Sequence, residues 1–184
     1  MAKRGPRILG GRWRGRVLAV GPGTRPTEAR VREAVFQILE PWLDGCRFLD
    51  LFAGSGAAGF EALSRGAREA WLVDRSGKGM DVLRRNRREL GAGESCRLLR
   101  AGLPRGLEKL NGPFDVVYAD PPYDFPGYTE LLALVSPLLA TDGRLVLEHA
   151  SRREPEPPPT LDLLERRRYG DSVLSFFARR NTSP

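Results

Sequence analysis

The chain has 184 residues, of which 41% are hydrophobic, and this is enough for one domain with a sizeable core. The formal net charge of +7 favours a polyanionic partner, and no apolar run approaches the roughly 20 residues that a membrane span needs. The N-terminus also lacks the apolar core of a signal peptide, so we expect no membrane association. The cysteines, Cys46 and Cys96, fit no metal or redox spacing, which predicts reduced thiols in a cytoplasmic protein without a metal site.

The first 26 residues are basic and contain no acid. Apolar residues at Ile8–Leu9 and Val17–Val20 flank a glycine-rich turn, which predicts a short β-hairpin. A hairpin of this size buries little surface, so we expect residues 1–26 to be an extension that rests on a domain of residues 27–184. A disordered basic tail is the alternative, against which the apolar flanks and Trp13 argue.

Residues 27–40 have the apolar spacing of an amphipathic helix, with Thr27 as a candidate N-cap. Arg30 and Arg32 do not belong to the apolar stripe of this helix. We therefore expect both side chains to lie away from the core, near the start of the helix. Pro41 ends the helical pattern.

Apolar strands and helices then alternate, which predicts a parallel sheet covered on both faces. After a proline-rich loop, two last strands separated by a glycine turn predict an antiparallel hairpin at one edge. The fold class is thus α/β, with a mostly parallel sheet of seven strands. The expected strands are 47–52, 70–73, 96–100, 114–119, 144–149, 161–169 and 172–178, and the expected helices after the first are 57–64, 79–90, 105–110 and 128–139.

Glycines 54, 56 and 59 form the pattern G-x-G-x-x-G between the first strand and the following helix. Without Cβ atoms, the backbone there can turn sharply and approach a ligand at the helix N-terminus. A nicotinamide enzyme would show the same pattern. However, a dinucleotide places its pyrophosphate at this turn, whereas the carboxylate of Asp50 favours a cationic ligand such as S-adenosylmethionine.

Asp74 ends the second strand, where an acid can accept both hydroxyl groups of a ribose. Either kind of nucleotide cofactor would use such an acid, so Asp74 indicates nucleoside binding without choosing between them. The alternatives are a strand-end cap for Asp74 and a salt bridge for Asp50.

Asp120-Pro121-Pro122-Tyr123 follows the apolar strand at 114–119. The two prolines stiffen the turn and leave carbonyl oxygens as acceptors. The acid supplies a second acceptor, and the tyrosine offers a ring on which a base can stack. The tetrapeptide therefore predicts a site that holds a planar amino group, although a stiff loop with a solitary acid is the alternative.

The motifs F-L-D-L-F-A-G-S-G, an acid after the second strand, and D-P-P-Y occur in the order that is typical of S-adenosylmethionine-dependent amino-methyltransferases. Two further segments, R-P-T-E-A-R-V-R-E-A-V-F at Arg25–Phe36 and Arg168–Asp171, resemble those of the RsmD-type bacterial 16S rRNA guanine-N2 methyltransferases. The resemblance spans about residues 7–179. It implies a Rossmann-like methyltransferase fold and methylation of guanine 966 (16S rRNA numbering) in the small ribosomal subunit or an assembly intermediate.

The resemblance also implies which residues form the site. The catalytic residues are expected to be Asp120, Pro121, Pro122 and Tyr123. The cofactor is expected to contact Thr27, Asp50, Phe52, Ala53, Gly54, Ser55, Gly56, Gly59, Asp74, Arg75, Gly102, Leu103 and Asp120. The candidate RNA contacts are Arg12, Arg14, Arg16, Arg25, Arg30 and Arg32. Relatives often carry an acid after the third strand, where this chain has Gly102, so adenine contacts there are expected from the backbone or another residue.

The expected mechanism is direct, in-line methyl transfer to the exocyclic amine. The Asp120 carboxylate and the Pro121 carbonyl would accept the two N–H groups of that amine, while the base stacks on Tyr123. Orientation of this kind can contribute roughly 7–11 kcal/mol. The single histidine, His149, has no nucleophile beside it in the sequence, which predicts a structural role.

Four other functions compete with this one. An adenine-N6 DNA methyltransferase shares D-P-P-Y but usually has a separate target-recognition region, and a protein glutamine methyltransferase would favour asparagine at position 120. A noncatalytic RNA-binding ribosome assembly factor needs no cofactor turn, and a nicotinamide oxidoreductase gives D-P-P-Y no role. We expect a monomer that acts on 16S rRNA.

Overall fold

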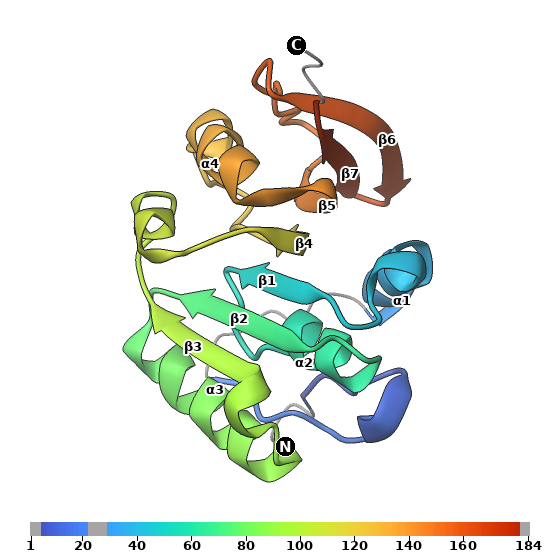
Figure 1. The fold of residues 1–184 in the computed structure, drawn as a ribbon, viewed down its shortest axis with the longest axis vertical. Coiled ribbons are helices and arrows are strands. Elements are labelled where there is room, and N and C mark those ends of the chain that lie inside the picture. Colours follow the sequence, from blue (N-terminus) through green and yellow to red (C-terminus); the bar gives the residue numbers. More distant parts are fainter. Residues whose placement is uncertain (1–4, 22–28, 181–184) are drawn as a thin grey trace.

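The computed structural model describes residues 5–21 and 29–180. Its strands are β1 Arg47–Leu51, β2 Glu69–Asp74, β3 Cys96–Arg100, β4 Phe114–Ala119, β5 Leu139–Ala150, β6 Leu161–Tyr169 and β7 Ser172–Arg179. They form one seven-stranded sheet in the order β3-β2-β1-β4-β5-β7-β6 (Figure 1). The strands from β1 to β5 are parallel, and β7 is antiparallel to both β5 and β6. The expected mixed sheet with a C-terminal antiparallel hairpin is confirmed.

Helices cover both faces of the sheet. The α-helices are α1 Ala29–Leu39, α2 Ala57–Ser64, α3 Gly77–Leu90 and α4 Tyr128–Val135, and the 3-10 helices are η1 Gly11–Trp13, η2 Glu40–Trp42, η3 Gly93–Ser95, η4 Arg105–Lys109 and η5 Ser136–Leu138. The apolar residues of α1, α2 and α3 share one buried cluster with Phe48, whereas those of η4 and α4 share the other with Leu49. Adjacent strand residues point to opposite faces, so β1 contributes to both clusters.

The segment after α4 differs from the expected helix at 128–139. The α-helix ends at Val135, η5 follows, and β5 begins at Leu139 instead of Arg144. Pro137 contributes to the early end, because proline has no N–H for the helical ladder. The additional strand residues are accommodated by an irregular register, in which Phe114 pairs with Leu139 but Val116 pairs with Arg144.

The N-terminal segment at residues 5–21 folds back on itself as the expected hairpin, with an antiparallel bridge between Arg7 and Val17. The N–H groups of Ile8, Gly15 and Leu18 donate across it to the carbonyls of Arg16, Ile8 and Pro6, each at 2.9 Å. Other backbone groups of the segment bond to helices. The N–H groups of Leu9 and Gly10 donate to the Glu61 carboxylate in α2 at 2.7 and 2.8 Å. On the returning arm, Ala19 exchanges two hydrogen bonds with Asn86 in α3.

The same segment contributes apolar side chains to the main core. Ile8 and Leu18 are 1% and 2% exposed and belong to the cluster beneath α1, α2 and α3. The segment is therefore attached through buried contacts. The division into an extension of residues 1–26 and a domain of residues 27–184 stays a prediction.

His149 and the two cysteines lie in packed surroundings. The His149 Nε2 and the Ser175 Oγ are 2.8 Å apart, which links β5 to β7, and burial lowers the pKa of the imidazole. Cys46 and Cys96 are free and buried, and burial raises the pKa of each thiol to about 12. Within the described ranges, no three metal-ligating side chains gather at one place. Of the helices in these ranges, none is long and apolar enough to cross a bilayer.

Candidate active site

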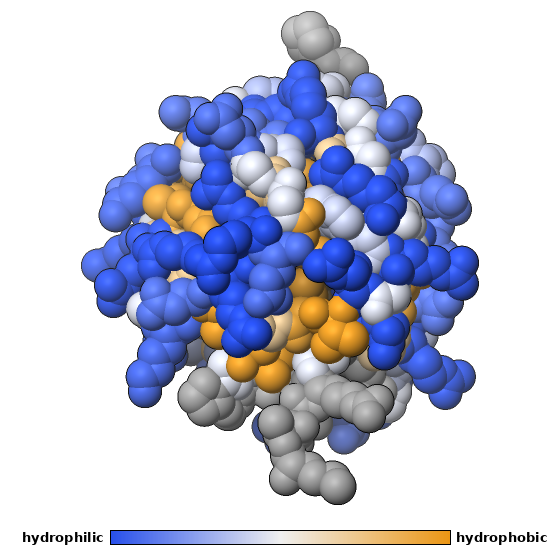
Figure 2. All heavy atoms as spheres, turned by 90° about the horizontal axis from the view of Figure 1, so that it is seen from below, coloured by the Kyte–Doolittle hydropathy of each residue, from blue (hydrophilic) through white to orange (hydrophobic). Residues whose placement is uncertain are grey.

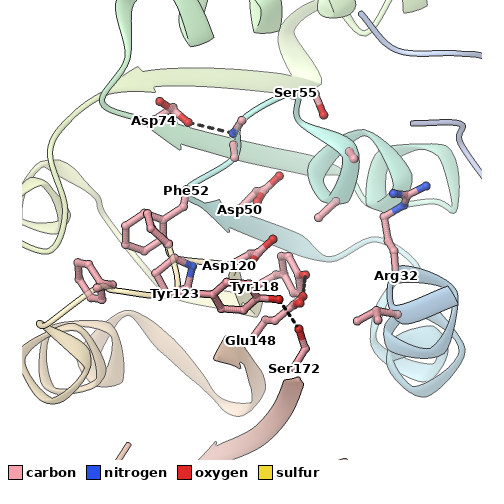
Figure 3. Close-up of a pocket in the computed structure, with 18 of the residues that line it drawn as sticks. Arg32, Asp50, Phe52, Ser55, Asp74, Tyr118, Asp120, Tyr123, Glu148 and Ser172 are labelled. Atoms are coloured by element: carbon pink, nitrogen blue, oxygen red, sulfur yellow. Dashed lines mark hydrogen bonds between the residues drawn. The ribbon is translucent and has the colours of Figure 1, made fainter. Parts of the chain in front are cut away.

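A cavity of about 1120 Å³ opens at the carboxyl ends of the parallel strands (Figure 3). The order of the strands reverses between β1 and β4, and ligands of open α/β sheets bind at this switch point. The expected catalytic and cofactor residues that line the cavity are Asp50, Phe52, Ala53, Gly54, Ser55, Asp74, Arg75, Leu103, Asp120, Pro121, Pro122 and Tyr123. The sheet thus brings chain segments that are distant in sequence to one site.

The turn after β1 has an uncommon backbone conformation. Phe52 has a φ of 64°, in the left-handed region that side chains other than glycine rarely adopt, and Gly54 and Gly56 have φ values of 55° and 80°. The Phe52 ring meets the Phe125 ring edge-on, with the ring centroids 5.1 Å apart. This contact holds Phe52 in the cavity wall, where strained residues commonly have a functional reason.

Asp74 connects this turn to the end of β2. Its Oδ2 accepts the N–H of Gly54 at 2.9 Å (Figure 3). Its Oδ1 accepts the N–H of Ser76 at 2.8 Å. Asp74 therefore does cap the end of the strand, which was the alternative role considered for it. Each carboxylate oxygen has a second lone pair, so the contact with ribose hydroxyls stays a prediction.

Gly56 and Gly59 are packed closely and are not among the residues that line the cavity, and the expected cofactor contact at both positions stays a prediction. A Cβ on Gly59 would lie 2.6 Å from the Cδ1 of Leu72, and one on Gly56 would lie 2.6 Å from the Cε2 of Phe60. Only glycine at both positions lets α2 lie this close to the sheet.

Asp50 is the most deeply buried acid of the cavity, with an exposed fraction of 2%. Its Oδ2 accepts the N–H of Gly59 at 2.9 Å, and it makes no ion pair with any residue that the structure describes. The pKa of Asp50 is raised to about 8, chiefly by burial; the bond from Gly59 lowers it, and the charges of Asp120 and Asp74 add smaller upward shifts. A cationic ligand would favour the ionised form.

The end of β3 contributes to the cavity through the two neighbours of Gly102. Ala101 and Leu103 line it, and the expected cofactor contact at Gly102 between them stays a prediction. From the end of β2, the exposed Arg75 also reaches the lining.

The tetrapeptide at residues 120–123 begins where β4 ends. The N–H of Asp120 donates to the Leu51 carbonyl at 3.3 Å, which fixes the acid beside the end of β1. The Tyr123 hydroxyl and the Ser172 Oγ are 2.9 Å apart, and this contact connects the loop after β4 to β7. The expected site for an amino group is therefore next to the glycine turn, as Figure 3 shows for Asp120 and Asp50.

Sequence reasoning missed a second set of lining residues on the far side of Asp120. Tyr118 and Glu148, both buried, line the cavity, and the Tyr118 hydroxyl donates to the Glu148 Oε2 at 3.0 Å. The turn between β6 and β7 adds residues 169–172. The sequence did offer a signal. Side chains alternate between the two faces of a strand, so Tyr118 lies on the same face as Asp120. Glu148 is an acid among apolar residues of its strand, which is unusual.

Arg32 is buried, which corrects the expectation that it lies away from the core. Its exposed fraction is 2%, and its Nη2 donates to the Arg7 carbonyl at 2.6 Å. Among the described residues, nothing accepts from its Nε or Nη1. Burial lowers the pKa of the guanidinium, and the negative charge of Glu61 opposes this shift. Since Arg32 lines the cavity (Figure 3), it is suited to an anionic group of a ligand.

The other candidate RNA contacts separate into two places. Arg30 is exposed and lines the cavity. Arg12, Arg14 and Arg16 are exposed near η1, which is tied to the C-terminal end of α2 by the bond from the Trp13 N–H to the Ser64 Oγ at 2.9 Å. The cavity lies at the other end of this eight-residue helix, about 12 Å away. Thr27 and Arg25 lie outside the described residues.

Solved structures with the same architecture identify the class. The structure of the Escherichia coli protein yhhF superposes with a TM-score of 0.85 at 35% identity, covering 95% of this chain and 97% of that one. A Thermus thermophilus protein, TTHA0928, gives a TM-score of 0.81 at 34% identity, covering 95% and 99%. The fold and the site at its switch point define a Rossmann-like methyltransferase.

Sequence comparison then gives the family. The family model described as Conserved hypothetical protein 95 matches residues 6–178. Ribosomal RNA small subunit methyltransferase D of Escherichia coli (strain K12) is 43% identical over 119 residues, 64% of this chain and 60% of that protein. The protein YlbH of Bacillus subtilis (strain 168) is 36% identical over 184 residues, 95% of this chain and 99% of that protein. The chain belongs to the RsmD family of methyltransferases.

Proposed function

We propose that this protein transfers a methyl group from S-adenosylmethionine to the exocyclic N2 of a guanine in 16S rRNA, which is guanine 966 by family resemblance. The observation that carries the proposal is the meeting of Asp120-Pro121-Pro122 with the glycine turn in one cavity of about 1120 Å³. Pockets for one small ligand usually enclose about 300–1,000 Å³, so there is room for a cofactor and a base. The name of the Escherichia coli relative supports rRNA as the substrate.

The residues on the β1 and β2 side fit S-adenosylmethionine. This cofactor supplies a methyl group that is activated by a positively charged sulfur. Asp50 is an anion for its cationic groups, Asp74 an acceptor for its ribose, and Arg32 a donor for its carboxylate. The strongest sign of fit is that Nε and Nη1 of Arg32 lack acceptors among the described residues, because a buried guanidinium in this state is costly until an anion binds.

The residues after β4 hold the target base. The Asp120 carboxylate and the Pro121 carbonyl accept the two N–H groups of the guanine amine, which directs the nitrogen toward the methyl donor. Tyr123 stacks on the base, and its contact with Ser172 fixes the ring. Asp120 acts mainly by orientation, because the proton is strongly acidic after methyl transfer and can leave to water.

The RNA surface extends beyond the cavity. Arg30 and Arg75 stand at the cavity, and Arg12, Arg14 and Arg16 extend the positive surface along α2. Hydrophilic side chains cover most of the face seen from below Figure 1, with hydrophobic areas between them (Figure 2). Exposed arginines beside the cavity suit the phosphates around a flipped base and make binding depend on salt. We propose a cytoplasmic monomer that acts on the small subunit or its assembly intermediate.

The test is methyl transfer from tritiated S-adenosylmethionine to 30S subunits isolated from cells that lack this methylation. Nucleoside analysis should find the label in N2-methylguanosine, and primer extension should locate it at one nucleotide. Label in adenine would support the DNA-type alternative instead, and RNA binding without any transfer would support the assembly factor.

A further inference from the structure

Glu148 is a second carboxylate on the substrate side of the cavity. It lies in β5, where Leu147 pairs with Ala119 of β4, so Glu148 and Asp120 each stand one residue beyond this pair. Glu148 is 6% exposed and lines the cavity. Figure 3 shows it near Tyr118 and Asp120, on the same face of the sheet. The proposed mechanism gives this acid no role.

Tyr118 determines how Glu148 can bond. The Tyr118 hydroxyl donates to the Glu148 Oε2 at 3.0 Å. Burial, followed by the charges of Asp120 and Glu148, raises the pKa of the phenol well above its usual value, so it stays a donor at neutral pH. Glu148 is therefore presented as an acceptor whose orientation is fixed through one oxygen.

A carboxylate in the cavity wall can accept N–H groups of a ligand. Glu148 and Asp120 present two such acceptors on one face of the sheet. A ligand edge that carries more than the two N–H groups of an amine could bond to both acids.

Guanine has such an edge. Its N2 amine adjoins N1–H, a further donor, whereas the N6 amine of adenine adjoins N1 without hydrogen, an acceptor. We infer that Glu148 accepts the N1–H of the target guanine while Asp120 holds the amine, and that Glu148 thereby selects guanine over adenine. Against adenine, two acceptors would face each other, which is a repulsive element that excludes the wrong base. This inference rests on the proposed function and identifies the residue that sets its base specificity.

The experiment compares two bases at the target nucleotide. The substrate is 30S subunits reconstituted with 16S rRNA that carries either guanine or 2,6-diaminopurine there, introduced by ligation of a synthetic fragment. Diaminopurine keeps the N2 amine but lacks N1–H. The wild-type protein should prefer guanine by at least about 100-fold in kcat/KM, as sites that bind an N–H strongly reject analogues without it.

Glu148→Gln should reduce this preference to below about tenfold, because the amide can also donate to an unprotonated N1. Its affinity for S-adenosylmethionine, measured by calorimetry, should stay within about twofold of the wild-type value, since a hydrogen bond to the base is not made in that complex. Glu130→Gln, at an exposed position on α4, is the matched control and should keep the wild-type preference.

An equal loss with both bases in Glu148→Gln would overturn the inference, because a structural role lowers both rates alike. If this variant does not fold, the wild-type protein alone still tests the inference. Equal rates with guanine and diaminopurine would show that the protein does not recognise N1–H. If the wild-type protein does not methylate 30S subunits that carry guanine at the target nucleotide, the proposed function itself is overturned.

Discussion

The two walls of the cavity are built in different ways. The cofactor wall, residues 50–55 and 74–75, is held by carboxylates that accept backbone N–H groups, over sequence separations of 9 and 20 residues. The base wall, residues 118–123, 148 and 169–172, is held by contacts between side chains, over separations of 30 and 49 residues. Backbone donors persist whatever the side chains are. The base wall also has backbone ties, such as the bond from the Asp120 N–H to the Leu51 carbonyl, but its links to Glu148 and Ser172 each depend on two side chains. Substitutions in the base wall should therefore change substrate use and leave cofactor binding intact.

The largest effect is expected at Asp120. Asp120→Ala removes an acceptor for the amine and should lower the rate of methyl transfer about 100- to 1,000-fold, as loss of one preorganised polar group in an active site commonly does. Calorimetry should show little change in the affinity for S-adenosylmethionine. The exposed Asp142→Ala is the control. Loss of cofactor binding, or retained activity, would contradict the separation of the two walls.

Arg32 provides the next largest effect, on the cofactor side. Arg32→Met should weaken binding of S-adenosylmethionine about 10- to 100-fold, because hydrogen bonds to a charged group are worth about 1.5–3 kcal/mol. Binding of decarboxylated S-adenosylmethionine should be unchanged, since that analogue lacks the partner.

The melting temperature of unliganded Arg32→Met should not fall, because an apolar side chain of similar volume replaces a buried charge that lacks acceptors at Nε and Nη1 in the described part of the chain. Arg30→Met is the matched control, on the same helix but exposed. Equal weakening with both ligands would assign Arg32 a structural role only.

Asp50 should make cofactor binding depend on pH. Below its pKa of about 8 the carboxyl is neutral, so binding of a cation must release a proton. Affinity should therefore rise between about pH 6 and 7.5, by up to about tenfold per pH unit. Asp50→Asn should abolish this slope, whereas the exposed Asp81→Asn should keep it.

The unliganded fold should show the opposite trend at Asp50. The folded-state pKa of about 8 exceeds the unfolded value of 3.8, so the protonated form stabilises the fold. This contribution is complete below the unfolded pKa and is lost as the pH rises through about 8. Chemical denaturation at several pH values, with Asp50→Asn alongside, measures it. A wild-type slope that survives in Asp50→Asn rules out Asp50 as its source.

The smallest effect is expected at the contact between Tyr123 and Ser172. Ser172→Ala and Tyr123→Phe each remove one neutral hydrogen bond and should lower kcat/KM for RNA about two- to tenfold. The double variant should be no worse than either single one, because both remove the same contact. Independent, multiplying losses would show that the contact does not position the ring.

The difference between the walls also explains what could be predicted from the sequence. Three strands, 96–100, 114–119 and 161–169, have the expected bounds, because glycine or proline lies close to their ends in the sequence and marks the turns. The glycine turn and residues 120–123 were found for a related reason: each motif is contiguous, and its chemistry is local.

Long-range contacts were not predictable in this way. Glu148 and Ser172 become cavity residues only through the pairing of β5 with β4 and with β7. Arg32 was misplaced because the buried stripe of α1 also includes Phe36, and the N-terminal segment beside it accepts the guanidinium through the Arg7 carbonyl. The N-terminal hairpin is joined to α2 and α3 because the side chains of Glu61 and Asn86 bond to its backbone groups. No local pattern reports these partners.

The position of β7 between β5 and β6 has a consequence for synthesis. During translation the ribosome produces every strand of the cofactor wall before β7, which carries Ser172 and fills the gap beside β5. A domain generally folds as a unit, so the base wall is completed only when the final hairpin has been made and pairs with the sheet. Until then Tyr123 lacks its contact with Ser172.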